Sequence, residues 1–183
     1  MIKKRVIGVM VVITLGILFY VGYTNINQKY PKSIEVTASI GESQLFSEGN
    51  KIRVTKMERL DAKAEESMGI PKTDLGFERK IYLVYCTFSN ETKEKQELNI
   101  TDCYIETTGW GNGLQLDLYL SLNPKEQTTK MMLEGGESKE VILPYQILSN
   151  GFQEKEWKKI DSRKFRLLYS EYPIKYSISL QHK

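Results

Sequence analysis

The hydrophobic pattern divides the chain into one continuous apolar run and a longer region in which apolar and polar residues alternate. Val6 to Tyr23 contains no charged side chain. At ~1.5 Å per helical residue this run is roughly 27 Å long, close to the ~30 Å hydrocarbon core of a bilayer. Backbone groups in lipid need internal partners, so the run predicts a helix. We expect a single transmembrane helix over residues 6–23.

The charges around this run predict its orientation. Lys3, Lys4 and Arg5 precede it, and the next cation is Lys29. The positive-inside rule places residues 1–5 in the cytoplasm as a basic tip and exports the remainder. The chain is then a single-pass plasma-membrane protein with an extracellular C-terminal domain. The alternative is a cleaved signal peptide, although Gly22-Tyr23-Thr24 matches the usual small-residue cleavage pattern poorly.

Beyond the run, the period changes from that of a helix to that of a strand. Residues 24–33 are polar, include Pro31 and are expected to form a linker. Ile34 to Ile40 alternates apolar and polar residues, as a half-buried strand does. Ile81 to Phe88 is almost uncharged and rich in β-branched and aromatic residues, which indicates a central strand.

Three further segments decide the fold class. Leu114 to Leu122 carries a leucine at every second position and predicts a strand with Leu118 fully buried. Pro144 lies within an apolar segment and indicates an edge strand or a bulge. Phe152 to Ile160 is the one helical candidate in the domain, with Trp157 on its apolar stripe, apart from a helical turn near residues 62–67. Seven to nine short strands separated by turns predict an all-β antiparallel sandwich over residues 34–183.

The net charge of the chain argues against one class of partner, nucleic acids. The whole chain carries +3, and without Lys3, Lys4, Arg5 and Lys29 the remaining residues carry −1. Nucleic-acid binding needs a clustered basic face, so we expect no nucleic-acid partner.

Several stretches carry a resemblance to a known group. They are YLVYCTFSN, the GGESK turn before VILPY, and FRLLYSEYPIKYSISL. With them, residues 34–181 resemble the telokin-like, immunoglobulin-like domains of unknown function on cell-surface proteins of Gram-positive bacteria. The resemblance implies an immunoglobulin-like sandwich at the cell surface and brings no catalytic residue or cofactor. Many members of the group carry a lipid-anchor cysteine, whereas this chain has its apolar run instead.

The candidate site residues are few. Cys86 and Cys103 form a disulfide in one interpretation, which an exported compartment permits, and remain two buried free thiols in the other. Trp110 lies in a glycine-rich turn. It is a candidate for a binding loop, because tryptophan is enriched at interface hot spots, or it caps the open end of the sandwich.

Enzyme signatures are missing from the sequence. The single histidine, His182, is next to the last residue, and no G-x-S-x-G, H-E-x-x-H or P-loop motif occurs. The acids Glu65, Glu66, Asp74 and Glu78 share one long segment but lack calcium-loop spacing. We therefore expect no enzyme, cofactor or metal. The hypothesis is a membrane-anchored binding or accessory module for an envelope protein or cell-wall polymer; the alternative is a structural ectodomain of an accessory subunit in a membrane transporter complex.

Overall fold

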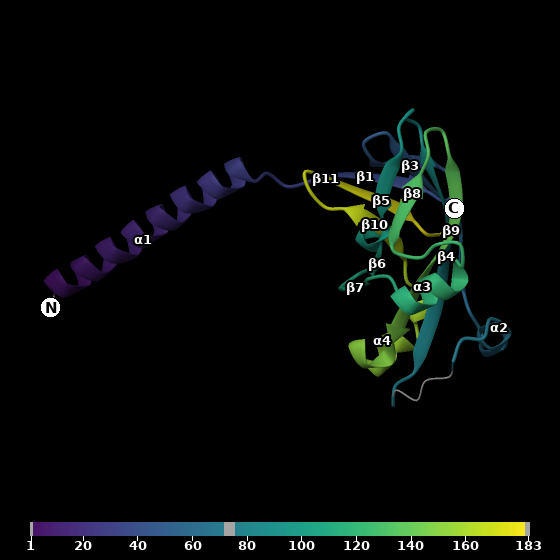
Figure 1. Cartoon of the computed structure of the whole chain (residues 1–183). Coiled ribbons are helices and arrows are strands. Elements are labelled where there is room, and N and C mark those ends of the chain that lie inside the picture. Colours follow the sequence, from purple (N-terminus) through teal and green to yellow (C-terminus); the bar gives the residue numbers. More distant parts are fainter. Residues whose placement is uncertain (1, 72–75, 182–183) are drawn as a thin grey trace. The chain divides into compact units, whose positions relative to one another are not determined.

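The computed structural model describes residues 2–71 and 76–181 and divides into two compact units, with the boundary between Ile34 and Glu35 (Figure 1). The first unit contains helix α1 (Ile2–Lys29). Within its segment Val6–Lys29, the most apolar window of 18 residues has a mean hydropathy of 2.3, and none of this window is buried. By length and composition this helix can cross a membrane, and a signal sequence meets the same criterion.

Helix α1 is longer than expected. Residues 24–29, predicted to be linker, form its last turns, so only residues 30–33 connect it to the first strand. The polar side chains of this end bond to helix carbonyls: Thr24 Oγ1 donates to Val21 O at 3.0 Å and Asn27 Nδ2 to Tyr23 O at 2.7 Å. These local bonds satisfy the polar side chains within the helix, and the helix-breaking Pro31 comes only after its end.

The second unit is a β-sandwich, as predicted, with eleven strands in the described residues rather than seven to nine. A five-stranded sheet has the order β1-β11-β10-β6-β7, a four-stranded sheet has the order β2-β3-β4-β9, and β5 pairs with β8. The strands are β1 (Ile34–Ser39), β2 (Ser43–Ser47), β3 (Asn50–Arg59), β4 (Arg79–Asn90), β5 (Gln96–Asn99), β6 (Tyr104–Thr107), β7 (Trp110–Asn112), β8 (Lys130–Leu133), β9 (Ser138–Leu148), β10 (Arg166–Ser170) and β11 (Ile174–Ser179).

Strand β4 is the central strand that its apolar sequence predicted. It pairs antiparallel with β3 on one side and with β9 on the other. Tyr82, Val84 and Phe88 point from β4 into the main core between the sheets. Strand β1, by contrast, is an edge strand, and of its expected apolar face only Ala38 is buried, while Ile34 and Val36 are exposed.

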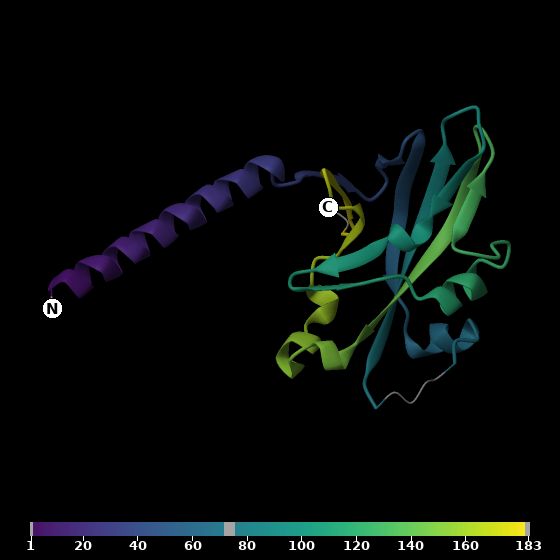
Figure 2. The same cartoon turned by 60° about the vertical axis from the view of Figure 1, so that its left-hand side comes forward.

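The outer face of the four-stranded sheet carries a second, smaller core. Ile81 and Leu83 project from β4 to this side and are buried together with Leu60 and Ile70. Helices α2 (Ala62–Ser67) and α3 (Leu116–Leu122) lie on this side of the domain (Figure 2). The helical turn predicted near residues 62–67 is thus confirmed.

The predicted strand over Leu114–Leu122 is wrong, because Leu116–Leu122 forms helix α3. Leu118 is only partly buried in the outer core, and Leu116 and Leu120 are 45% and 37% exposed. The residue that is fully buried is Tyr119, which enters the main core. Successive helical residues are ~100° apart, so alternate leucines fall on different faces. A helix at the edge of a sandwich can place side chains in the main core, in the outer core and in solvent at the same time.

The position of α3 follows from the edge that it covers. Strand β9 ends the four-stranded sheet, which confirms the edge position predicted from Pro144. The Asn123 side chain accepts from Ile142 N at 2.9 Å and donates to Ile142 O at 2.9 Å, as a neighbouring strand would. Gln115 N donates to Pro144 O at 2.9 Å. These contacts close an edge that could otherwise pair with another chain.

The predicted helical segment near Trp157 is confirmed as a short helix, α4 (Glu154–Trp157), between the 3₁₀ turns Ser149–Gly151 and Ile160–Ser162. A third 3₁₀ turn spans Ile100–Asp102. Trp157 is buried in the main core, as expected from its place on the apolar stripe.

Candidate functional site

Cys86 and Cys103 are both free and buried. Cys86 lies on β4, and Cys103 follows the 3₁₀ turn before β6, so the two side chains enter the main core from different sheets. Burial raises the pKa of both thiols well above the usual value, and the neighbouring Cys103 raises that of Cys86 further. The thiolate is the reactive form of cysteine, so these two side chains serve as apolar core residues.

Trp110 begins β7, opposite Thr107 of β6, and is half-buried against the main core. Its ring lies 5.5 Å from that of Phe152, which lies 6.0 Å from Trp157. Gly109 has φ +73°, so glycine is required by this turn. Trp110 therefore belongs to an aromatic cap at one end of the sandwich and also lines a hollow of about 300 Å³. Its role as a binding residue stays a prediction.

The described acids of the long segment before β4 do not gather at one site. Glu65 pairs with Arg79 at 2.8 Å, and Glu78 accepts from Trp157 Nε1 at 2.5 Å. Asp74 and His182 lie outside the described residues. Within the described part of the chain, no group of three or more His, Cys, Asp or Glu side chains could hold a metal ion.

A hollow of about 830 Å³ lies on the outer face of the four-stranded sheet, beside α3. We call it the β9 groove. Its lining includes the outward residues Tyr85 and Thr87 of β4 and Ile142 of β9. The segment that follows α3 also lines it with Asn123, Pro124, Lys125 and Glu126. The same edge contacts that cover β9 therefore also shape this groove.

Tyr85 is held in place in the groove by its neighbours on β3. Its hydroxyl donates to Glu58 Oε1 at 2.5 Å, and Lys56 Nζ lies 4.1 Å from the centre of its ring. Hydrogen bonds from Lys56 and Tyr85 lower the pKa of Glu58. Burial and the Glu58 carboxylate raise the pKa of Tyr85 to about 12. Tyr85 is therefore a neutral phenol at physiological pH, with a fixed ring.

The polar lining of the groove combines both charge signs with hydroxyl groups. Lys139 of β9 reaches Glu126 at 3.3 Å, and both side chains are partly buried. Thr87 Oγ1 is buried and has no hydrogen-bond partner among the described residues. This oxygen is covered by protein atoms, so it is not part of the accessible polar lining of the groove.

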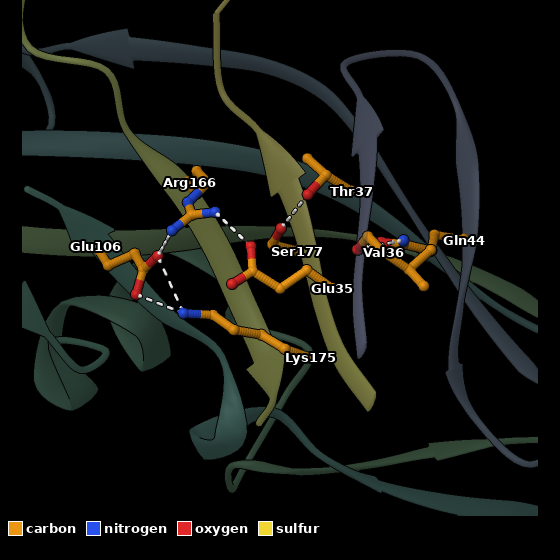
Figure 3. Close-up of polar contacts among 8 residues, drawn as sticks. All are labelled: Glu35, Val36, Thr37, Gln44, Glu106, Arg166, Lys175 and Ser177. Carbon is orange, nitrogen blue, oxygen red and sulfur yellow. Dashed lines mark hydrogen bonds and ion pairs between the residues drawn. The ribbon is translucent and has the colours of Figure 1, made fainter. Parts of the chain in front are cut away.

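The outer face of the five-stranded sheet is also charged, but its charges pair with one another (Figure 3). Arg166 of β10 binds Glu106 of β6, and its other guanidinium nitrogen lies 3.7 Å from Glu35 of β1. Lys175 of β11 completes the set at 3.4 Å from Glu106. Thr37 and Ser177 share a 2.9 Å hydrogen bond beside them. This network ties the edge strand β1 to its sheet and leaves little charge to attract a ligand.

Sequence reasoning missed the β9 groove. Its residues come from β3, β4, the segment after α3 and β9, which only the fold brings together. The one signal in this part of the sequence is Asn123-Pro124. Such a pair is typical of the end of an element, and nothing in it indicates the wall of a groove.

Comparison with known proteins gives a family. Residues 28–176 match the model of a family described as a domain of unknown function, DUF5028. No curated protein matches the chain. An uncharacterized β-sandwich protein from Clostridium difficile 630 is 15% identical, with a TM-score of 0.47, covering 82% of this chain and 97% of that one. A conserved hypothetical protein from Bacillus anthracis is 16% identical, with a TM-score of 0.49. The match covers 79% of this chain and 95% of that one.

Proposed function

We propose that this chain, which belongs to the DUF5028 family, is a membrane-tethered binding module displayed on the outer face of the plasma membrane. One observation carries the proposal. An apolar helix long enough to cross a membrane precedes a domain that has its own complete core. A buried helix would be part of that core, whereas this one has none of its most apolar window buried. Such a helix needs an apolar environment that the chain itself does not supply.

The domain supports binding better than catalysis. Its thiols are buried in the main core. The β9 groove has a volume of about 830 Å³, within the ~300–1,000 Å³ of typical ligand sites. The groove offers hydroxyls, paired charges and one fixed aromatic ring, which can hold a ligand but form no general acid–base pair. The resemblance to telokin-like, immunoglobulin-like surface domains supports the same interpretation, and that finer relationship stays a prediction.

Protease treatment of intact protoplasts tests the display of the domain. The full chain is produced in a Gram-positive host, and trypsin is added outside the protoplasts. Lys29 ends α1 and Lys32 lies within the short connection to β1, so we expect trypsin to cleave there and to release the folded sandwich into the medium. A cytoplasmic marker protein, intact until lysis, is the control. A sandwich that is protected until the protoplasts are lysed would place the domain inside the cell and overturn the proposal.

A further inference from the structure

We infer that the hollow beside Trp110 binds an acidic segment of another envelope protein, in which an aromatic or other apolar side chain lies next to a carboxylate. This inference rests on the proposed function, because it names the kind of partner that the binding module takes. The hollow, called the Trp110 hollow below, has a volume of about 300 Å³. This is at the lower end of the volumes of ligand sites, so the hollow suits a few side chains and not a large ligand.

The indole N–H of Trp110 is a donor without an acceptor. Its Nε1 makes no hydrogen bond among the described residues, and it is not fully covered by protein atoms. The other tryptophan differs, because Trp157 Nε1 donates to Glu78 Oε2 at 2.5 Å. A partly buried indole N–H usually has a partner, so the N–H of Trp110 is available to a ligand that accepts a hydrogen bond.

Gly151 leaves space beside this donor. A Cβ added at Gly151 would lie 3.4 Å from Trp110 Nε1 and 3.7 Å from Cδ1, so the N–H edge of the indole faces this glycine. Gly151 does not have the positive φ that requires glycine at Gly109. The backbone at position 151 therefore admits a larger residue, and its side chain would cover the donor.

The charges around the hollow favour an anion. Arg163 and Lys155 bring two positive charges to the lining, and Glu156 brings the one negative charge. Lys155 is exposed and forms no ion pair within the described part of the chain. The hydrogen bond from Arg163, together with the charges of Lys155 and Lys159, lowers the pKa of Glu156. Three cations thus surround one carboxylate, and they attract a second one.

The unpaired positive charge covers too little surface for a polyanion. Around α4 and the 3₁₀ turn that follows it, other cations already have acidic partners. Lys158 pairs with Glu154 at 2.6 Å. Arg59 and Lys80 both pair with Asp161, at 2.8 and 2.6 Å. A polymer of phosphates binds to an extended basic surface, and these pairs interrupt such a surface here.

The aromatic rings of the hollow suit a protein ligand. Trp110 and Phe152 pack against the main core but are only partly buried, and their ring centres are 5.5 Å apart. Arg163 Cζ lies 5.3 Å from the centre of the Phe152 ring. Aromatic and arginine side chains are enriched at the centres of protein interfaces. An apolar side chain of the partner can pack on these rings while its neighbouring carboxylate accepts from the indole N–H.

Titration with synthetic peptides tests the inference. The full chain in lipid nanodiscs carries ¹⁵N-labelled tryptophan, so its NMR spectrum contains one indole signal for each of its two tryptophans. The probe is a hexapeptide in which Glu and Phe alternate, and two matched peptides replace Glu by Gln or Phe by Ser. We expect the probe to shift the Trp110 signal in a saturable manner and to leave the Trp157 signal in place. Each matched peptide should bind about tenfold more weakly.

Two variants place the site. Lys155→Glu reverses an exposed charge, so it should leave stability unchanged and weaken binding of the probe about tenfold. Gly151→Ala covers the indole N–H and should weaken binding about fivefold. The matched control is Lys125→Glu, since Lys125 is also exposed and lines the β9 groove, which shares no lining residue with the Trp110 hollow. It should bind like the unmodified protein.

Four results would overturn the inference. Equal binding of the Glu and Gln peptides would show that the ligand need not be acidic. Tighter binding of poly(glycerol phosphate) than of the probe would replace the protein segment by a wall polyanion. Equal binding by all variants would remove the Trp110 hollow as the site, and no binding of the probe would exclude an acidic segment of this kind. The protoplast experiment tests the display of the domain separately, so none of these results touches that proposal.

Discussion

Tyr119→Ala is expected to lower the free energy of unfolding by about 3–5 kcal/mol, the usual cost of truncating a buried aromatic side chain. Tyr119 is fully buried in the main core, and its hydroxyl has no partner among the described residues. The loss therefore comes from packing and not from a broken hydrogen bond. Chemical denaturation followed by circular dichroism would measure it.

The leucines beside Tyr119 provide the control. Leu120 is exposed, so Leu120→Asp should change stability by less than about 0.5 kcal/mol. Leu118 packs partly against the outer core, and Leu118→Asp should have an intermediate cost. If this segment were a strand, Leu118 and Leu120 would share one buried face and both aspartates would unfold the domain. A severe effect of Leu120→Asp would contradict helix α3.

Asn90→Ala is the second change for which we expect a large effect, a loss of about 3 kcal/mol or more in stability. Asn90 is 2% exposed, and its Nδ2 donates to the carbonyls of Glu94, Leu133 and Glu134. Its Oδ1 accepts from Thr92 N at 2.9 Å. Each bond contributes about 1 kcal/mol, and buried carbonyls left without a donor add to the cost. Thermal and denaturant unfolding would measure the change.

Asn99→Ala is the matched control for Asn90. Asn99 is exposed, and its side chain bonds locally to Thr101 and Asp102. Its removal should cost less than about 1 kcal/mol. Equal effects of the two substitutions would show that Asn90 does not join separate elements.

Asn90 also explains two of the stretches that carried the family resemblance. It ends YLVYCTFSN, and its backbone N donates to Glu137 O at 2.9 Å while its O accepts from Gly136 N at 3.1 Å. Both partners belong to the GGESK turn. A side chain at Gly135 would collide with the backbone of Lys93. The two stretches, more than forty residues apart, thus form one structural unit that neither stretch alone reveals.

The elements that sequence predicts well are those whose environment is uniform along their length. The apolar run has the same kind of surroundings on all sides of its helix, and β4 has an apolar core on each of its two faces. The composition alone therefore indicates each of these two elements. The segment around α3 faces the main core, the outer core and solvent within seven residues. Its leucine alternation is compatible with a strand, and only the β9 edge that it covers makes a helix the better solution.

The candidate site was harder to predict than the fold for a related reason. Trp110 is a candidate for a binding loop in sequence because it is an aromatic residue among glycines. In the structure, Gly109 is needed by the turn, and the Trp110 indole is half-buried. The β9 groove carries no motif, because Tyr85, Thr87 and Lys139 are ordinary residues in sequence. What distinguishes them is their position on one face beside a covered edge, and that is a property of the tertiary structure.

The most direct test of the tether is the intact mass of the protein recovered from cells. The account predicts the full 21.2 kDa chain in the membrane pellet, resistant to alkaline washing, because α1 stays attached and spans the bilayer. A shorter soluble species that begins near Asn25 would contradict it, since α1 would then be a signal peptide removed during export.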